Sequence, residues 1–172
     1  DLQGGGSDLL FPHHYMSAKI VQAAYGREFS SLYIHAGMIG LDGEKMSKSK
    51  GNLKFVSVMR ISGVDPLVIR IALLSGHYRT DRAWSDVLLK QSSERLALWR
   101  QAFSSPYGGD VEPLIRAVAE RLADDLDTPG SFELLDRWAQ TRIHGLEIEE
   151  REAVSDIGQL SRFLDASLGI AL

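Results

Sequence analysis

Apolar residues recur every three or four positions through most of the chain after residue 65, and this spacing constrains the fold more than any other feature. Residues with this spacing share one face of an α-helix, and that face must be buried against a neighbouring element. Capping residues mark the expected helix starts, which are Asp65 with Pro66, Ser85 with Asp86, Asp110, and Thr128 with Pro129. The faces comprise Ile69, Ala72 and Leu73; Leu88, Ser92, Leu96, Trp99 and Phe103; Val111, Leu114, Ile115, Val118 and Leu122; Phe132, Leu135, Trp138 and Ala139; and Ala153, Ile157, Leu160, Leu164 and Leu168. These faces predict helices that pack on one another.

The first 56 residues have a different pattern. In order, they contain a glycine turn at 4–6, a helical stretch at 12–25, a β-prone run at 32–41 and a lysine-rich loop. Mixed segments of this kind are typical of α/β structure. We therefore expect a mainly α fold with a small α/β part at residues 1–56. Residues 57–172 are expected to form a helical domain, with connector helices at 57–103 and a small bundle at 110–172.

The composition excludes several classes of protein. With 172 residues, of which 44% are hydrophobic, the chain is globular rather than disordered. Its net charge of −4 disfavours nucleic-acid binding through overall charge. Because it has no cysteine, it can form neither a disulfide nor a cysteine-ligated metal site of its own. We find no signal peptide and no apolar stretch that could span a bilayer, and we expect a cytoplasmic protein with no membrane partner.

Residues 44–52, EKMSKSKGN, concentrate positive charge in an otherwise acidic chain and have no apolar periodicity. Ammonium groups, hydroxyls and flexible backbone are supplied by Lys45, Lys48, Lys50, Ser47, Ser49, Gly43 and Gly51. A phosphate ligand needs such donors, and each charge-assisted hydrogen bond contributes about 1.5 to 3 kcal/mol. The composition alone is equally compatible with a solvated basic loop on the surface.

The string KMSKS at 45–49 resembles the signature loop of class I aminoacyl-tRNA synthetases, and we call residues 44–52 the signature loop. Four further strings follow the order found in cysteinyl-tRNA synthetases and the related mycothiol cysteine ligases, namely GGGSDLLFPHH (4–14), YIHAGM (33–38), SGHYRTD (75–81) and ADDLDTP (123–129). The resemblance covers nearly the whole chain. It implies that residues 1–56 are the C-terminal part of a Rossmann-like, nucleotide-binding catalytic domain. It also implies a C-terminal fragment that is inactive alone, since the first half of that domain would precede Asp1.

The resemblance also implies functional residues. In the family, a glycine turn and a short strand hold the aminoacyl-adenylate and the adenine, and the signature loop stabilises the phosphates. Carried over to this chain, the nucleotide-binding residues are Gly6, Ser7, Asp8, Ile39, Lys45, Ser47, Lys48 and Ser49. Lys45 and Lys48 are the expected catalytic residues. Lys48 is the stronger candidate for stabilising the departing pyrophosphate.

By the same resemblance, His13 matches a zinc ligand that acts with two cysteines upstream of this chain and binds the substrate thiol. Cysteinyl-tRNA synthetases commonly carry a carboxylate four residues later, where this chain has Ser17, a residue associated with the ligase branch. Tyr15 is atypical for both families. We expect structural roles for the remaining histidines considered, which are His14, His35 and His77.

The function that the resemblance implies is ATP-dependent ligation, in which cysteine is activated as cysteinyl-adenylate and transferred to the amine of glucosaminyl-inositol on the route to mycothiol. The expected substrates are ATP with Mg²⁺, L-cysteine and glucosaminyl-inositol, and the expected state is a monomer. One alternative is the C-terminal portion of a cysteinyl-tRNA synthetase, whose acceptor is a tRNA hydroxyl. Another is a non-catalytic helical binding module.

Overall fold

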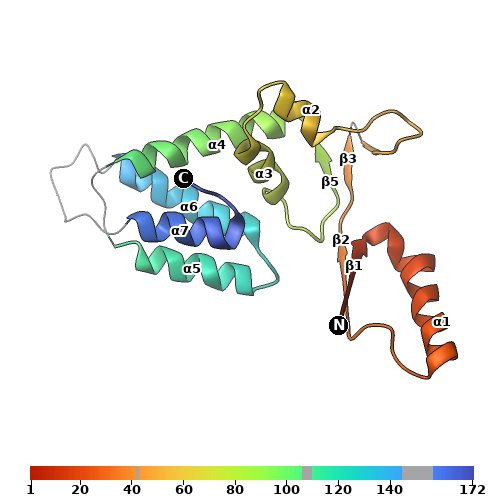
Figure 1. Cartoon of the computed structure of the whole chain (residues 1–172). Helices are drawn as coiled ribbons and strands as arrows, with labels where there is room; N and C mark the ends of the chain where they lie inside the picture. The colour runs from red at the N-terminus through yellow and green to blue at the C-terminus, as the bar shows by residue number, and fades with distance from the viewer. Residues whose placement is uncertain (42, 106–109, 145–156) are drawn as a thin grey trace. The chain divides into compact units, whose positions relative to one another are not determined.

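The structure, a computed structural model, describes residues 1–41, 43–105, 110–144 and 157–172. The chain forms two compact units, and the first contains Asp1–Lys54 together with Tyr78–Ser85. The second contains Phe55–His77 and Asp86–Leu172 (Figure 1). The mainly α fold with a small α/β part is confirmed. The return of residues 78–85 to the first unit was not among the sequence predictions, and the domain limit at residue 56 stays a prediction.

The first unit contains a β-α-β arrangement. Its elements are β1 (Leu2–Gly6), a 3₁₀ turn (Ser7–Leu9), an irregular helical segment (Leu10–His14), α1 (Tyr15–Tyr25) and β2 (Leu32–Ala36). β1 and β2 pair in parallel, with Leu2 opposite Leu32 and Gly6 opposite Ala36. The regular helix begins at Tyr15 rather than at Pro12, because Phe11 is extended, with φ −137° and ψ 136°. Parallel strands need such a crossover, so α1 is the connection that this pairing requires.

The β-prone run at 32–41 forms two strands in different sheets rather than one continuous strand. After β2, the chain enters β3 (Ile39–Leu41), which lies between β4 (Glu44–Lys45) and β5 (Arg82–Trp84). Gly37 lies at the break. A Cβ there would overlap the backbone of Thr80, so only glycine fits this crossing.

The second unit is helical, as expected. Its helices are α2 (Val56–Ile61), α3 (Pro66–Leu74), α4 (Asp86–Ser104), α5 (Glu112–Ala123), α6 (Thr128–His144) and α7 (Ile157–Leu168). Asp65 caps α3 by accepting a hydrogen bond from the Leu67 amide at 2.9 Å. Asp110 makes the same kind of bond, because its Oδ1 accepts from the backbone amide of Glu112 at 2.9 Å, and the regular helix begins at Glu112. Ala153 lies outside the described residues.

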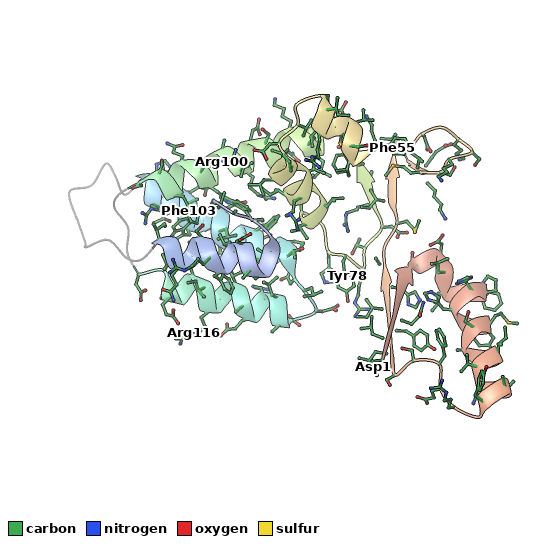
Figure 2. The ribbon with its side chains drawn as sticks, viewed as in Figure 1. Asp1, Phe55, Tyr78, Arg100, Phe103 and Arg116 are labelled. Carbon is green, nitrogen blue, oxygen red and sulfur yellow. The ribbon has the colours of Figure 1, made fainter. Side chains whose placement is uncertain are left out.

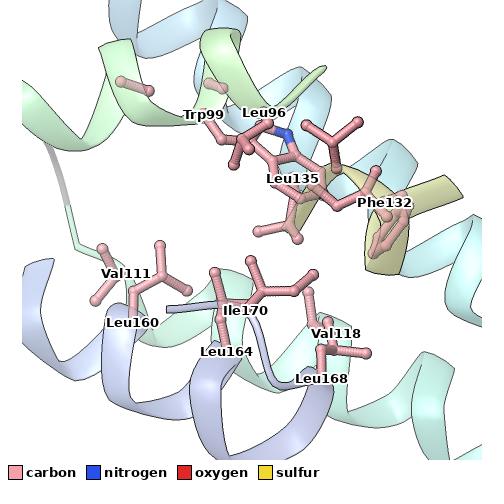
Figure 3. Close-up of a cluster of buried hydrophobic side chains, with 14 residues drawn as sticks. Leu96, Trp99, Val111, Val118, Phe132, Leu135, Leu160, Leu164, Leu168 and Ile170 are labelled. Carbon is pink, nitrogen blue, oxygen red and sulfur yellow. The ribbon is translucent and has the colours of Figure 1, made fainter. Parts of the chain in front are cut away.

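A single apolar core joins helices α3 to α7 (Figure 3). Its buried members come from α3 to α7 and from the segments that flank α5 and α7. They are Val68, Ile71, Leu96, Trp99, Ala102, Val111, Val118, Phe132, Leu135, Ala139, Leu160, Leu164, Leu168 and Ile170. Because α3 and α4 supply part of this cluster, the helices before and after residue 110 stabilise one another.

Polar side chains hold the helices of this unit at defined positions. Asp136 on α6 accepts from the indole Nε1 of Trp99 at 2.8 Å, and it also accepts from Arg95, whose Nη2 lies at 3.0 Å. A buried indole N–H needs a partner, and Asp136 supplies it. Arg100, labelled on α4 in Figure 2, lies 2.9 Å from the carboxylate of Asp65 at the start of α3.

None of the helices in the described part of the chain is both long enough and apolar enough to cross a membrane.

The core predicts a clear difference between two substitutions. Leu164 is fully buried, so Leu164→Ala should lower the free energy of unfolding by about 2 to 5 kcal/mol through lost burial and a residual cavity. Val87 on α4 is 65% exposed, so Val87→Ala should change the free energy of unfolding by no more than about 0.5 kcal/mol. Urea unfolding followed by far-UV circular dichroism measures both. Equal effects would contradict this description of the core.

Candidate functional site

The signature loop starts from a β-hairpin. β3 pairs antiparallel with β4, so Gly40 lies opposite Lys45. Gly43, next to the hairpin turn, has a φ of +78°, which glycine adopts without strain. A Cβ on Gly40 would come within 2.8 Å of the Glu44 carbonyl oxygen, so the two backbones are in close contact. The hairpin therefore fixes the backbone position of Lys45.

Lys45 forms an ion pair with the glycine turn. Its Nζ lies 2.5 Å from Oδ2 of Asp8, which brings together two predicted site residues from distant parts of the sequence. Both side chains are about half exposed, so solvent screens the pair. The hydrogen bond from Lys45 holds the pKa of the Asp8 carboxyl below its ordinary value, and Asp8 is therefore ionised at neutral pH. A ligand amine or hydroxyl that binds Asp8 must share this carboxylate with Lys45 or displace the lysine.

The other two lysines of the signature loop differ in their pairing. Lys50 Nζ lies 2.9 Å from Oε2 of Glu44, so its charge is offset within the loop. Lys48 makes no ion pair with any residue that the structure describes. Within residues 44–52, Lys48 is thus the ammonium left for an anionic ligand.

Hydroxyl groups lie next to this ammonium in the sequence. Ser47 Oγ and Ser49 Oγ are 3.2 Å apart and form a hydrogen bond. Ser47 Oγ also accepts from the backbone amide of Lys50 at 3.4 Å. The two predicted serines flank Lys48 in the sequence, and their hydroxyl groups are held close together.

The glycine turn is closely packed. A Cβ on Gly6 would come within 2.6 Å of Asp8 Oδ1 and 3.3 Å of Met38 Sδ, so the absence of a side chain lets the turn approach residue 38. Ser7 is exposed at the start of the 3₁₀ turn. Ile39 begins β3, half-buried and opposite Arg82. The turn, the start of β3 and Lys45 thus lie in one region, while their roles as nucleotide ligands stay predictions.

Two histidines pair next to the turn, and one of them, His14, is buried. His14 is 3% exposed, its Nδ1 lies 2.8 Å from His35 Nε2, and its Nε2 lies 3.1 Å from the Gln3 amide nitrogen. Burial lowers the pKa of His14, so the ring is neutral, with Nε2 accepting from Gln3 and Nδ1 donating to His35. Both histidines were expected to have structural roles, but no pattern in the sequence predicts their pairing. The pair ties β1, β2 and the segment before α1 together.

The described residues do not fit a zinc site by themselves. His13 is exposed, and its backbone carbonyl accepts a hydrogen bond from Ser17 Oγ at 2.9 Å. No group of three or more potential metal ligands occurs among the described residues. A catalytic zinc needs three protein ligands and a structural zinc needs four. Among the described residues, His13 can therefore supply one zinc ligand at most.

Tyr15 contacts two neighbouring side chains, Phe11 and Lys19. Its ring centroid lies 5.8 Å from that of Phe11, and Lys19 Nζ lies 5.7 Å above the ring. Tyr15 also lines an apolar recess of about 300 Å³ with His14 and Tyr33. These contacts place the residue that was atypical for both families at the start of α1, half exposed and beside this recess.

The chain is similar to curated ligases over its full length. An L-cysteine:1D-myo-inositol 2-amino-2-deoxy-alpha-D-glucopyranoside ligase from Streptomyces griseus is 52% identical to it, and the match covers the whole of this chain and 41% of the ligase. The ligase of the same name from Saccharomonospora viridis is 58% identical over 80% of this chain and 34% of its own length. The chain thus spans about two fifths of the curated relatives that it matches over its full length.

A solved structure shares the fold. In a ternary complex of LeuRS, tRNA and LeuAMS from Agrobacterium radiobacter, one chain matches with a TM-score of 0.69 and 16% identity. The match covers 98% of this chain and 26% of that one. The likeness concerns the fold alone.

The family model described as tRNA synthetases class I (C) catalytic domain matches residues 1–94, which is more than half of the chain and includes the glycine turn, the histidine pair and the signature loop. The chain therefore belongs to the family of class I (C) tRNA synthetase catalytic domains.

Proposed function

We propose that this chain is part of an ATP-dependent ligase that joins cysteine to the amine of glucosaminyl-inositol. The proposal rests on sequence identity: about half of the residues over the full chain are identical to those of relatives that carry this ligase name. The matched region covers the helical unit as well as the synthetase region. The proposal therefore concerns the acceptor as well as the activation chemistry.

The reaction has two steps. The carboxylate of cysteine attacks the α-phosphate of ATP, which forms cysteinyl-adenylate and releases pyrophosphate. The amine of the acceptor then attacks the activated carbonyl, forms the amide and releases AMP. Protein groups contribute by positioning the reactants and by offsetting charge, so no covalent enzyme intermediate is needed.

The signature loop acts in the first step. Lys48, whose ammonium makes no ion pair with a described residue, offsets the charge that develops on pyrophosphate. Lys45 joins it when phosphate competes with Asp8 for the ammonium, and the hydroxyls of Ser47 and Ser49 supply further donors. ATP enters with Mg²⁺, which shares the charge of the phosphates.

Adenylate binding involves the region around the glycine turn. Gly6 and Ser7 allow the backbone to approach the ligand, and Asp8 accepts from a ligand hydroxyl or amine. The backbone of Ile39 contacts adenine. His13, which is exposed, would supply one ligand if the whole protein binds zinc.

Lys48→Ala in the intact gene product should lower the rate of adenylation by roughly 30- to 1000-fold, equivalent to ~2 to 4 kcal/mol, because the interaction is strongest as pyrophosphate departs. Amide formation from preformed cysteinyl-adenylate should be largely spared. Pyrophosphate exchange and single-turnover transfer measure the two steps separately. The matched control is Lys50→Ala, which removes a lysine that Glu44 already neutralises and should change either step by less than about threefold. Equal losses in both steps for Lys48→Ala would reject its role.

The acceptor is tested by direct competition. Supplied with ATP, cysteine, glucosaminyl-inositol and tRNA, the intact gene product should form the sugar amide and leave tRNA uncharged. Mass spectrometry of the sugar and acid precipitation of labelled tRNA detect the two products. Charged tRNA without sugar amide would favour the cysteinyl-tRNA synthetase alternative, and absence of both products would favour a binding module.

A further inference from the structure

The second half of the signature loop turns sharply back on the first. The backbone amide of Gly51 donates to the carbonyl of Lys48 at 3.2 Å, and Gly51 has a φ of +64°. Glycine adopts this left-handed conformation at little cost, whereas other residues rarely do. The turn directs the next side chain, Asn52, towards the backbone at the start of the loop.

Asn52 bonds to that backbone with both ends of its amide. Its Oδ1 accepts from the amide of Ser47 at 2.9 Å, and its Nδ2 donates to the carbonyl of Lys45 at 3.3 Å. A primary amide offers the same donor and acceptor as a peptide group, so Asn52 pairs with residues 45–47 as a backbone segment would. The two bonds close residues 45–52 into a ring.

This ring contains the groups that the proposed reaction uses. Lys48 and Ser49 lie inside the ring, between Ser47 and Asn52, and the two backbone groups that Asn52 holds belong to Lys45 and Ser47. Ordering a free loop around a ligand would cost backbone entropy at each residue. A loop closed in advance avoids part of this cost, and small errors in the placement of catalytic groups reduce rates strongly.

We propose that Asn52 is the positioning residue of the signature loop, and that its two hydrogen bonds hold the loop in the shape from which Lys48 reaches the departing pyrophosphate. This inference rests on the proposed function. Asn52 acts through Lys48 and the loop backbone, without touching the reacting atoms. Its effect therefore belongs to adenylation and should be absent from amide formation.

The test compares Asn52→Ala and Asn52→Asp with Lys54→Gln in the intact gene product. Asn52→Ala removes both bonds and should lower kcat for pyrophosphate exchange roughly 10- to 30-fold, with the KM for cysteine and the transfer step unchanged within about twofold. Asn52→Asp keeps the acceptor for the Ser47 amide but loses the donor to the Lys45 carbonyl. Although aspartate has nearly the same shape as asparagine, this variant should not recover the wild-type kcat for pyrophosphate exchange. Lys54→Gln changes an exposed side chain two residues further on and should behave as wild type.

Hydrogen exchange at the Ser47 amide reports the ring directly. It should be faster in Asn52→Ala than in wild type and partly protected in Asn52→Asp, while the melting temperature stays the same in all variants. The inference would be overturned if Asn52→Ala left either the exchange rate of the Ser47 amide or the kcat for pyrophosphate exchange unchanged. Equal losses in both reaction steps would also overturn it. If wild type itself formed no cysteinyl-adenylate, the proposed function would fail first. Normal adenylation by Asn52→Ala beside a defective Lys48→Ala would reject this inference alone.

Discussion

The parallel pairing of β3 with β5 is the contact on which the arrangement around the signature loop depends. Gly37 allows the chain to pass the backbone of Thr80, and Asp81 then accepts a 2.6 Å hydrogen bond from the Met38 amide. Since β5 occupies one edge of β3, the other edge is left for β4. The signature loop starts from that second edge, so a strand some forty residues later in the sequence determines where it begins.

Charge pairing then divides the lysines of the signature loop into two kinds. Lys45 and Lys50 have carboxylate partners, Asp8 and Glu44, whereas Lys48 has no ion-pair partner in the described part of the chain. A uniform basic loop would attract anions without a preferred point of contact. Pairing two of the three ammonium groups concentrates the available charge at one position, which agrees with the role proposed for Lys48.

Much of the helical unit could be predicted from the sequence because its cues are local. The Asp65 cap, the start at Thr128 and the buried positions of Leu96, Trp99 and Leu135 all follow from capping residues and helical spacing. The strands were harder to predict. The run at 32–41 has continuous β propensity, and its break at Gly37 arises from a contact with residue 80 that no local pattern contains.

The helices and the family follow from local sequence, because helical faces and motif strings are formed by residues that are neighbours along the chain. The same strings predict the site residues, but which of those residues meet depends on tertiary contacts. The ion pair of Asp8 with Lys45 and the bond of His14 with His35 join positions far apart in the sequence, and their partners are selected by strand pairing. Even Asn52, only a few residues from its partners, acquired its place from the left-handed turn at Gly51, because the direction of a side chain depends on backbone angles that composition does not specify.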